Sequence, residues 1–217
     1  MSTLLMRLAA PLQSWGTESK FDVRRTEKEP SKSGVIGLVA AALGIRRDEN
    51  EKIERLSGLR FGVRVDKEGV MIRDYHIAKS GKDTYVTNRY YLSDAVFVVG
   101  LESTDEGILY QIEEALSHPV FPLYLGRRSC PPTGKLSLGI TPLSLEEVLS
   151  SAPIQNEKAD AVRIVIEAKK GNRGSLLRDQ PVSFNSENRQ YAFRQAIEMM
   201  VLPEQSLKGH DPMAELE

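Results

Sequence analysis

The chain has 217 residues, with 29 Lys and Arg against 30 Asp and Glu, a formal net charge of −1 and 41% hydrophobic residues. These values are ordinary for a folded globular protein, and the length suits one large domain or two small ones. A single cysteine excludes an intramolecular disulfide framework and a multi-cysteine zinc site, and it indicates a reducing compartment. The charge balance excludes a protein that is basic over its whole surface but permits a local basic groove.

The sequence contains no secretory signal pattern, and its longest apolar run is about half of what a membrane span needs. We therefore expect a cytoplasmic protein.

The first elements are expected to be a strand and two helices. A compact apolar run over 3–8 is typical of a buried strand, and a polar connection over 13–30 follows it. A serine before the apolar run 35–43 and a glycine after it predict a mostly buried helix. A second, short helix is expected over 49–56, ending at Gly58.

The next segments predict strands. Period-two alternation over 59–66 predicts a half-buried strand, and Glu68 and Gly69 predict a turn into a returning strand over 70–75. The polar stretch 79–88 predicts an exposed hairpin tip or a mobile finger. The continuous apolar run 95–101 predicts a central strand.

An amphipathic helix should follow this strand. Ser103 and Glu106 have the spacing of a capping box, and Ile108 begins an apolar helical face. Pro119 and Pro122 should end the helix.

The pattern changes after residue 142. A short helix is expected over 145–149, and alternating apolar residues over 162–166 predict a strand. A basic turn over 169–175 follows. Residues 187–202 are ambiguous between strand and helix, with two aromatic residues favouring a strand, and the polar end, 208–217, is expected to fray.

Together these elements predict an α+β fold. The order strand, helix, strand pair, strand, helix, strand up to residue 140 is compatible with a ferredoxin-like domain that carries an inserted hairpin. We expect this domain to cover 1–142 and a smaller, mainly β region to cover 143–217.

The segment YLGRRSCPPTG, 124–134, is the most distinctive local pattern. Glycine permits close backbone approach and the two prolines stiffen the loop. The adjacent Arg127 and Arg128 present paired donors suited to phosphate. A surface turn with two solvated arginines is the alternative.

The segment PSKSG, 30–34, stands at the start of the first predicted helix. The free N–H groups of a helix N-terminus suit phosphate oxygens, and Ser31, Lys32 and Ser33 add two hydroxyls and a cation. The spacing of a P-loop is absent, so nucleotide hydrolysis has no support. An ordinary serine N-cap is the alternative.

The segment RDYH, 73–76, precedes the polar finger, and Arg89 follows it beside two tyrosines. Arginine interleaved with aromatic residues suits base stacking combined with phosphate contact. His76 could also act as a general acid or base in RNA cleavage, although packing against the core edge is the simpler interpretation.

No other catalytic or metal-binding pattern is present. The histidines are scattered without a zinc motif, and no GxSxG is found. Cys130 is expected to be a structural thiol. We expect no cofactor and no metal.

Several of these segments, in this order, resemble the CasD subunits of type I-E CRISPR systems, in the RAMP superfamily. The matching segments are LMRLAAPLQSWG (5–16), PSKSGVIGLVAAALGI (30–45), RDYH (73–76), NRYYLSDAVFVV (88–99), YLGRRSCPP (124–132) and, more diffusely, VSFNSENRQYAFR (182–194).

The resemblance implies a ferredoxin-like, RRM-related domain with a protruding β-hairpin thumb, here 77–89. It implies a non-catalytic antiviral Cascade subunit that binds the 5′ handle of the guide RNA (crRNA), caps the CasC backbone and lies near the large subunit CasA. The candidate RNA-binding residues are Ser31, Lys32, Ser33, Arg73, Tyr75, His76, Arg89, Gly126, Arg127, Arg128 and Ser129.

Two other functions stay open at this point. Related RAMP proteins are metal-independent endoribonucleases that process repeat RNA, and Tyr75, His76 and Lys79 are the residues that could perform this chemistry here. The chain could also be an end-cap whose contacts are mainly with protein, in which case Arg127 and Arg128 would be dispensable for RNA retention.

Overall fold

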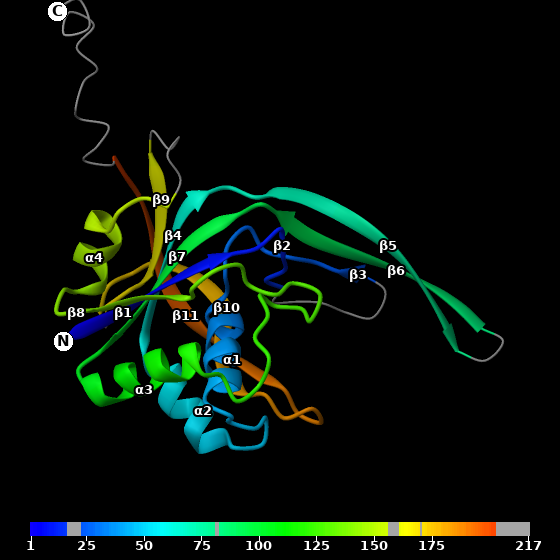
Figure 1. Cartoon of the computed structure of the whole chain (residues 1–217), viewed down its shortest axis with the longest axis horizontal. Coiled ribbons are helices and arrows are strands. Elements are labelled where there is room, and N and C mark those ends of the chain that lie inside the picture. Colours follow the sequence, from blue (N-terminus) through cyan, green and yellow to red (C-terminus); the bar gives the residue numbers. More distant parts are fainter. Residues whose placement is uncertain (17–22, 81–82, 156–160, 170, 203–217) are drawn as a thin grey trace, which may run out of the picture.

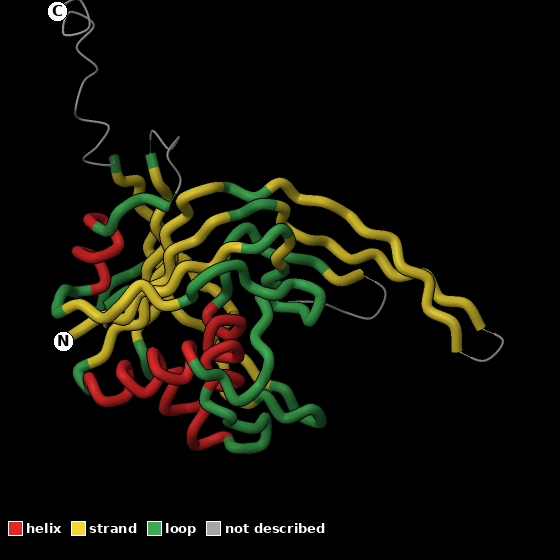
Figure 2. The backbone as a smooth tube through the Cα atoms, viewed as in Figure 1, coloured by secondary structure: helices red, strands yellow, loops and turns green. Residues whose placement is uncertain are grey.

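The computed structural model describes residues 1–16, 23–80, 83–155, 161–169 and 171–202. This part of the chain forms two mostly antiparallel sheets and four helices, which confirms the predicted α+β class (Figures 1 and 2). The helices are α1 (Lys32–Ala42), α2 (Asn50–Ser57), α3 (Glu106–Ser117) and α4 (Leu145–Ser151).

The larger sheet has seven strands in the order β10-β11-β9-β4-β7-β1-β8. These strands are β1 (Ser2–Ala9), β4 (Arg60–Lys67), β7 (Val96–Ser103), β8 (Ser137–Thr141), β9 (Val162–Glu167), β10 (Ser175–Ser183) and β11 (Gln190–Val201). All the pairings in this sheet are antiparallel, and the predicted central strand is β7, which lies between β1 and β4. Strands β9 to β11 therefore continue the sheet that the first strands begin.

Helices cover both faces of this sheet. The main core packs one face against α1, α2 and α3, and it includes the apolar face of α3 that the sequence predicts. A second, smaller core lies between the other face and α4 (Figure 1).

The prediction of a half-buried strand over 59–66 is wrong, because β4 is buried on both faces. Arg64 and Asp66, which look like solvent-facing residues in the sequence, lie under α4 and are 0% and 2% exposed. The Arg64 Nε atom is 2.6 Å from Asp66 Oδ1. The same guanidinium donates to the carbonyl oxygens of Leu149, Ala152 and Pro153, at the end of α4. These bonds satisfy a charge that would otherwise be costly to bury.

The structure confirms the helix predicted after the serine at position 31. Ser31 is the N-cap of α1, with extended backbone angles, and its Oγ accepts a hydrogen bond from Gly34 N at 3.2 Å. Gly44 follows the helix with φ +74°, a conformation that glycine adopts readily. A Cβ at Gly34 would lie 2.9 Å from the ring of Trp15, so the small residue lets the buried indole pack directly on the helix.

The smaller sheet consists of a long hairpin and two short strands. The hairpin strands are β5 (Val70–Ser80) and β6 (Asp83–Ser93). The short strand β2 (Leu12–Gln13) pairs with the base of β6, and β3 (Val23–Arg24) pairs with its middle. The hairpin projects from the body of the protein (Figure 1). It is longer than the predicted finger, because its strands pair continuously from Val70 and Ser93 outward.

The predicted strand pair before this finger does not form. After the turn at Glu68 and Gly69, β5 pairs with β6, while the neighbours of β4 are β7 and β9. The chain therefore leaves the larger sheet at this turn and builds a second sheet with β6.

Two further predictions about element ends need correction. The capping box at Ser103 and Glu106 is absent: Asp105 is the N-cap of α3, Ser103 accepts from Asp105 N, and Glu106 accepts a hydrogen bond from Ser2. The ambiguous segment 187–202 contains the strand β11, as its aromatic residues favour. Its partner, β10, was not predicted, and the frayed end expected over 208–217 lies outside the described residues.

Candidate nucleic-acid interface

A groove of about 1310 Å³ lies at the surface, bordered by α1, the segments around β2 and β3, the loop after α3 and the β10–β11 connection. Seven arginines line it: Arg24, Arg25, Arg46, Arg47, Arg127, Arg128 and Arg189. No lysine and no carboxylate belongs to this lining. The groove therefore concentrates positive charge in a chain whose formal net charge is −1.

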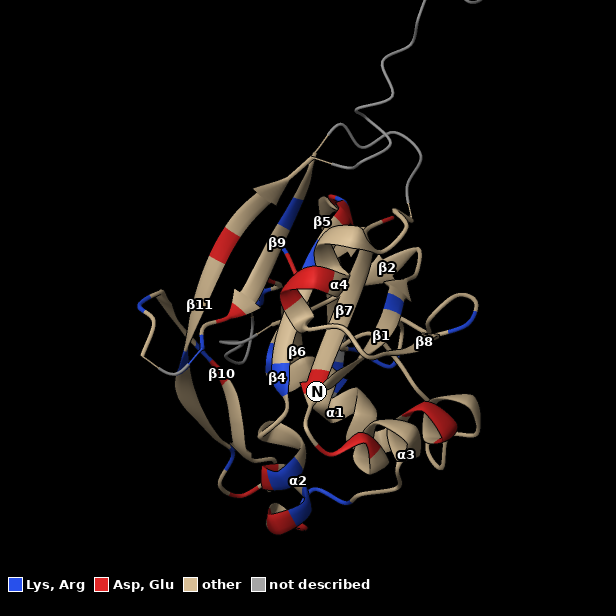
Figure 3. Cartoon of the chain, turned by 90° about the vertical axis from the view of Figure 1, so that its left-hand side faces the viewer, with Lys and Arg blue, Asp and Glu red and all other residues tan. Residues whose placement is uncertain are grey.

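These seven guanidiniums are free of carboxylate partners in the described part of the chain. No ion pair joins any of them to Asp or Glu, in contrast to buried cations such as Lys32 and Arg194. Six of the seven are exposed, and Arg127 is half-buried. Away from the groove, Figure 3 shows acidic segments on α3 and α4 and mixed charge on α2, so the positive charge is local.

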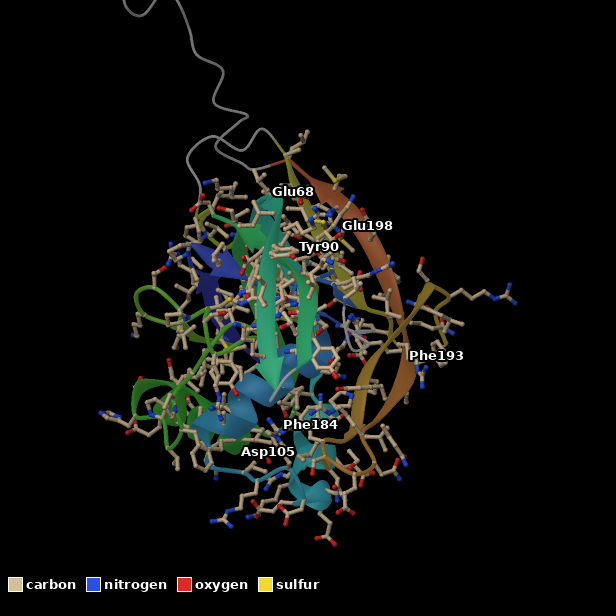
Figure 4. The ribbon with its side chains drawn as sticks, turned by 90° about the vertical axis from the view of Figure 1, so that its right-hand side faces the viewer. Glu68, Tyr90, Asp105, Phe184, Phe193 and Glu198 are labelled. Atoms are coloured by element: carbon tan, nitrogen blue, oxygen red, sulfur yellow. The ribbon has the colours of Figure 1, made fainter. Side chains whose placement is uncertain are left out.

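Aromatic side chains share the groove with the arginines. Phe121 and Tyr124 come from the loop after α3, and Phe184 and Tyr191 come from the β10–β11 region. Phe184, labelled in Figure 4, packs over α1 at Gly37, where an added Cβ would lie 3.9 Å from its ring. Guanidiniums alternating with aromatic faces suit a single-stranded nucleic acid, whose phosphates and bases need both kinds of contact.

The loop 124–134 has a conformation that depends on Gly126. Its φ is +87°, and a Cβ at this position would lie 1.7 Å from the carbonyl oxygen of Ser14. Ser14 N donates to Leu125 O at 3.1 Å, and Cys130 O accepts from Leu125 N at 2.7 Å. The glycine thus lets the loop cross the chain at Ser14, which is the close approach that the sequence predicts.

Arg127 is held in place within the groove wall. Its Nη2 donates to Arg24 O at 2.9 Å, and its guanidinium carbon lies 4.6 Å from the ring centroid of Tyr91. Burial would raise the pKa of the Tyr91 hydroxyl, but the hydrogen bonds with Ser129 and the nearby Arg127 guanidinium outweigh this effect, and the pKa lies below its ordinary value. Arg128 and Ser129 are exposed beside this cluster.

Cys130 closes the same loop from inside. It is 1% exposed, and burial raises the pKa of its thiol. A buried, protonated thiol fits the structural role predicted for it.

The start of α1 reaches the groove through its two serines. Ser31 and Ser33 line the groove, and their Oγ atoms lie 3.4 Å apart. Lys32 points elsewhere: it is 1% exposed, and its Nζ lies 2.7 Å from Glu167 Oε2. Burial lowers the pKa of this ammonium, an effect that the neighbouring carboxylate only partly offsets. The positive charge of Lys32 is therefore balanced by Glu167 inside the protein and does not face the groove.

The candidates on the hairpin lie apart from the groove lining. Successive side chains of β5 point to opposite faces of the hairpin, so Arg73 and Tyr75 share one face and His76 lies on the other. Lys79 shares the face of Tyr75 by the same alternation. His76 Nε2 pairs with Asp74 on its own strand.

Arg89 lies near the middle of β6, opposite Asp74 of β5 and beside Arg24 of β3. Its Nε is buried without a hydrogen-bond partner among the described residues. The structure thus brings together Ser31, Ser33, Gly126, Arg127 and Arg128 at the groove, and Arg89 lies next to Arg24 of this lining. The other hairpin candidates, Arg73, Tyr75 and His76, lie outside the lining.

Sequence reasoning missed five of the groove arginines. Four of them form the pairs Arg24–Arg25 and Arg46–Arg47, and the fifth is Arg189. The sequence contains three adjacent arginine pairs, and all three line the groove. Repeated pairing was a usable signal, although only the fold brings the pairs together.

The comparisons with known proteins agree with one another. A family model described as "CRISPR-associated protein (Cas_Cas5)" matches residues 3–197. The chain belongs to the Cas5 family. This Cas5 chain is 37% identical over 158 residues to the CRISPR system Cascade subunit CasD of Escherichia coli (strain K12), covering 64% of the chain and 70% of that protein. The predicted likeness to CasD subunits of type I-E systems is thereby confirmed.

Two solved structures have the same fold as this Cas5 chain. A structure described as "Crystal structure of Cas protein" is 42% identical with a TM-score of 0.77, covering 94% of this chain and 96% of that one. A chain of a "CRISPR RNA-guided surveillance complex" is 34% identical with a TM-score of 0.80, covering 93% and 90%.

The described residues contain no group of three or more His, Cys, Asp or Glu side chains that could hold a metal ion. Nor do they include a helix with the length and apolar character that crossing a bilayer requires.

Proposed function

We propose that this chain is a non-catalytic, RNA-binding subunit of a CRISPR RNA-guided antiviral surveillance complex, and that its arginine groove holds the 5′ handle of the guide RNA. The observation that carries the proposal is the groove itself, in which seven arginines without carboxylate partners among the described residues stand among five aromatic side chains. Related proteins belong to Cascade and to an RNA-guided complex, which supports the same role.

Within the groove, arginines and aromatic residues have different roles. The exposed arginines, such as Arg46, Arg47 and Arg128, contact phosphates, and Phe121, Tyr124 and Tyr191 stack on bases. Ser31 and Ser33 add hydroxyl donors. Lys32, with its ammonium on Glu167, supports the start of α1 instead of contacting RNA.

The proposed fold assignment is a ferredoxin-like domain with a thumb. The strand order β4-β7-β1-β8, with α1 and α3 on one face, supports this assignment, because it is the order of a βαββαβ sandwich. The boundary near residue 142 stays a prediction, and β9 to β11 extend the same sheet.

The β5–β6 hairpin would be the thumb of this domain. Its projecting strands carry exposed apolar side chains, among them Tyr75, Ile77 and Tyr85, each more than half exposed. We infer that these residues, with Arg73, contact the adjacent CasC backbone subunit and the RNA it carries, so that the chain caps the filament. CasA would dock nearby.

The endoribonuclease alternative has weaker support in the geometry. It asks Tyr75, His76 and Lys79 to act together, but Tyr75 and His76 point to opposite faces of β5, and His76 pairs with Asp74. Only Lys79 shares the face of Tyr75, so the three residues do not converge on one point of the hairpin.

The test is the RNA content of the assembled complex, with the chain co-expressed with its partner subunits and repeat RNA. Arg46→Ala/Arg47→Ala and Arg127→Ala/Arg128→Ala should each lower the retained RNA, since charge-assisted hydrogen bonds contribute roughly 1.5–3 kcal/mol each. Arg173→Ala, an exposed arginine outside the groove lining, is the matched control. Unchanged RNA content in both double variants would favour an end-cap held by protein contacts. A shortened RNA that becomes full-length in His76→Ala would establish the ribonuclease instead.

A further inference from the structure

A second pocket, of about 620 Å³, lies between α2 and the segment that joins β10 to β11. Five carboxamide side chains line it: Asn50, Gln180, Asn185, Asn188 and Gln190. Two serines and one carboxylate, Glu54, complete its polar lining, and no lysine or arginine takes part. The chemistry of this pocket is therefore that of neutral donors and acceptors, not of phosphate binding.

Several of these carboxamides have unused hydrogen-bonding capacity. Gln180 Nε2 donates to Ser57 O at 2.8 Å, while Gln180 Oε1 is buried without a partner among the described residues. Asn188 and Gln190 are exposed and make no side-chain hydrogen bond within the described part of the chain. The side chains of Asn188 and Gln190 are therefore the ones that can offer donors and acceptors to a ligand in this pocket.

The two cavities share the chain segment that follows β10. Ser183, Asn185 and Asn188 line the second pocket, while Phe184 and Arg189 line the arginine groove. Helix α2 is shared in the same way, with Ile53 on the groove and Asn50 on the second pocket. A polymer that follows the groove thus passes along the wall that separates it from the carboxamide pocket.

We infer that this second pocket receives an unpaired nucleobase of the RNA that the groove holds, and that its carboxamides read the hydrogen-bonding edge of that base. A carboxamide presents one donor group beside one acceptor, which is the arrangement that pairs with two neighbouring atoms on a base edge. The lining has no cation and includes the carboxylate of Glu54, so it favours a neutral base over a phosphate. This inference rests on the function proposed above and adds sequence discrimination to it.

The division of roles between the two cavities follows from their chemistry. Contacts of arginine with phosphates fix position and supply affinity but carry no sequence information, whereas contacts with base edges discriminate between sequences. The groove would therefore bind many single strands, and the second pocket would choose among them.

The experiment is a selection of short single-stranded RNAs with randomised sequence by the full-length chain, followed by sequencing of the bound fraction. The wild-type chain should retain the pool and enrich one base at one position. Asn188→Ala/Gln190→Ala, which changes two exposed side chains, should retain most pool binding but lose the preference, by about 5- to 150-fold for one well-paired base. Ser186→Ala is the matched control, because this exposed residue of the same segment lines neither cavity.

The outcomes separate this inference from the proposed function. An unchanged base preference in Asn188→Ala/Gln190→Ala, or a wild-type chain that binds RNA without any base preference, would overturn the inference alone. A wild-type chain that retains no more RNA than Arg46→Ala/Arg47→Ala would overturn the proposed function together with it.

Discussion

Arg46→Ala/Arg47→Ala should reduce the salt dependence of RNA binding by a calculable amount. The two side chains follow α1, line the groove, are exposed and have no carboxylate partner among the described residues, so their removal should leave the fold intact. Each phosphate neutralised on a single strand contributes about −0.7 to the slope of log K against log salt. If all seven groove arginines contact phosphates, the slope is about −5, and the double variant should have a slope of about −3.5.

The assay is the affinity for a labelled repeat RNA measured over a series of salt concentrations. Arg173→Ala, which removes an exposed charge away from the groove lining, should leave the slope unchanged. A slope that is the same in Arg46→Ala/Arg47→Ala as in the wild type would refute the reasoning. Equal changes in the control and the double variant would refute it too, because binding would then follow total charge and not the groove.

Three further predictions concern stability. Gly126→Ala should destabilise the fold by at least about 1–3 kcal/mol in urea unfolding, since its φ is +87° and the added Cβ would meet a carbonyl oxygen at 1.7 Å. Asp66→Ala should cost about 3–5 kcal/mol in thermal or urea unfolding, because it leaves the fully buried Arg64 guanidinium without its carboxylate. The hydrogen bonds and charge of Arg60 lower the pKa of Glu146 to about 2, so this carboxylate stabilises the fold above about pH 4.5 and loses that effect as the pH falls towards 2. Glu146→Gln should therefore narrow the difference in urea midpoint between neutral and acidic pH.

Matched variants make these three tests specific. Gly139→Ala also has a positive φ, of +106°, but an added Cβ would meet nothing within 4 Å, so it should cost less than Gly126→Ala. Glu187→Gln, at an exposed position, should leave the pH dependence as it is in the wild type. An unfolding midpoint unchanged by Asp66→Ala would contradict the assignment of the buried pair.

The sequence predicts well those helices that are determined by interactions between residues close together in the chain. Ser31 and Gly44 bracket α1 by chemistry that operates within one turn of helix, and the apolar face of α3 repeats at helical spacing. The β5–β6 finger could be located from its polar tip, although its full length depends on pairing between distant residues.

Where the sequence prediction is wrong, contacts between distant parts of the chain determine the structure. Arg64 and Asp66 have the polarity of a solvent-facing strand, and they are buried because the end of α4 supplies carbonyl acceptors to the guanidinium. Strand β10 lacks alternation and contains Pro181, a residue tolerated there because β10 is the edge of the sheet.

The candidate site could be predicted only in part, because it too depends on contacts between distant segments. The loop with Gly126, Arg127 and Arg128 was visible as a dense local motif. The pairs at Arg24 and Arg46 look like solvated surface residues in isolation, and they form a groove only because β3, the end of α1 and the loop after α3 meet in the fold.

The most direct test of the central claim is crosslinking of the assembled complex to its guide RNA, with the crosslinked peptides identified by mass spectrometry. The account predicts crosslinks between the 5′ handle and peptides that contain the groove segments at 24–25, 45–47, 121–131 and 184–191. Handle crosslinks confined to other surfaces, with none in these segments, would contradict it.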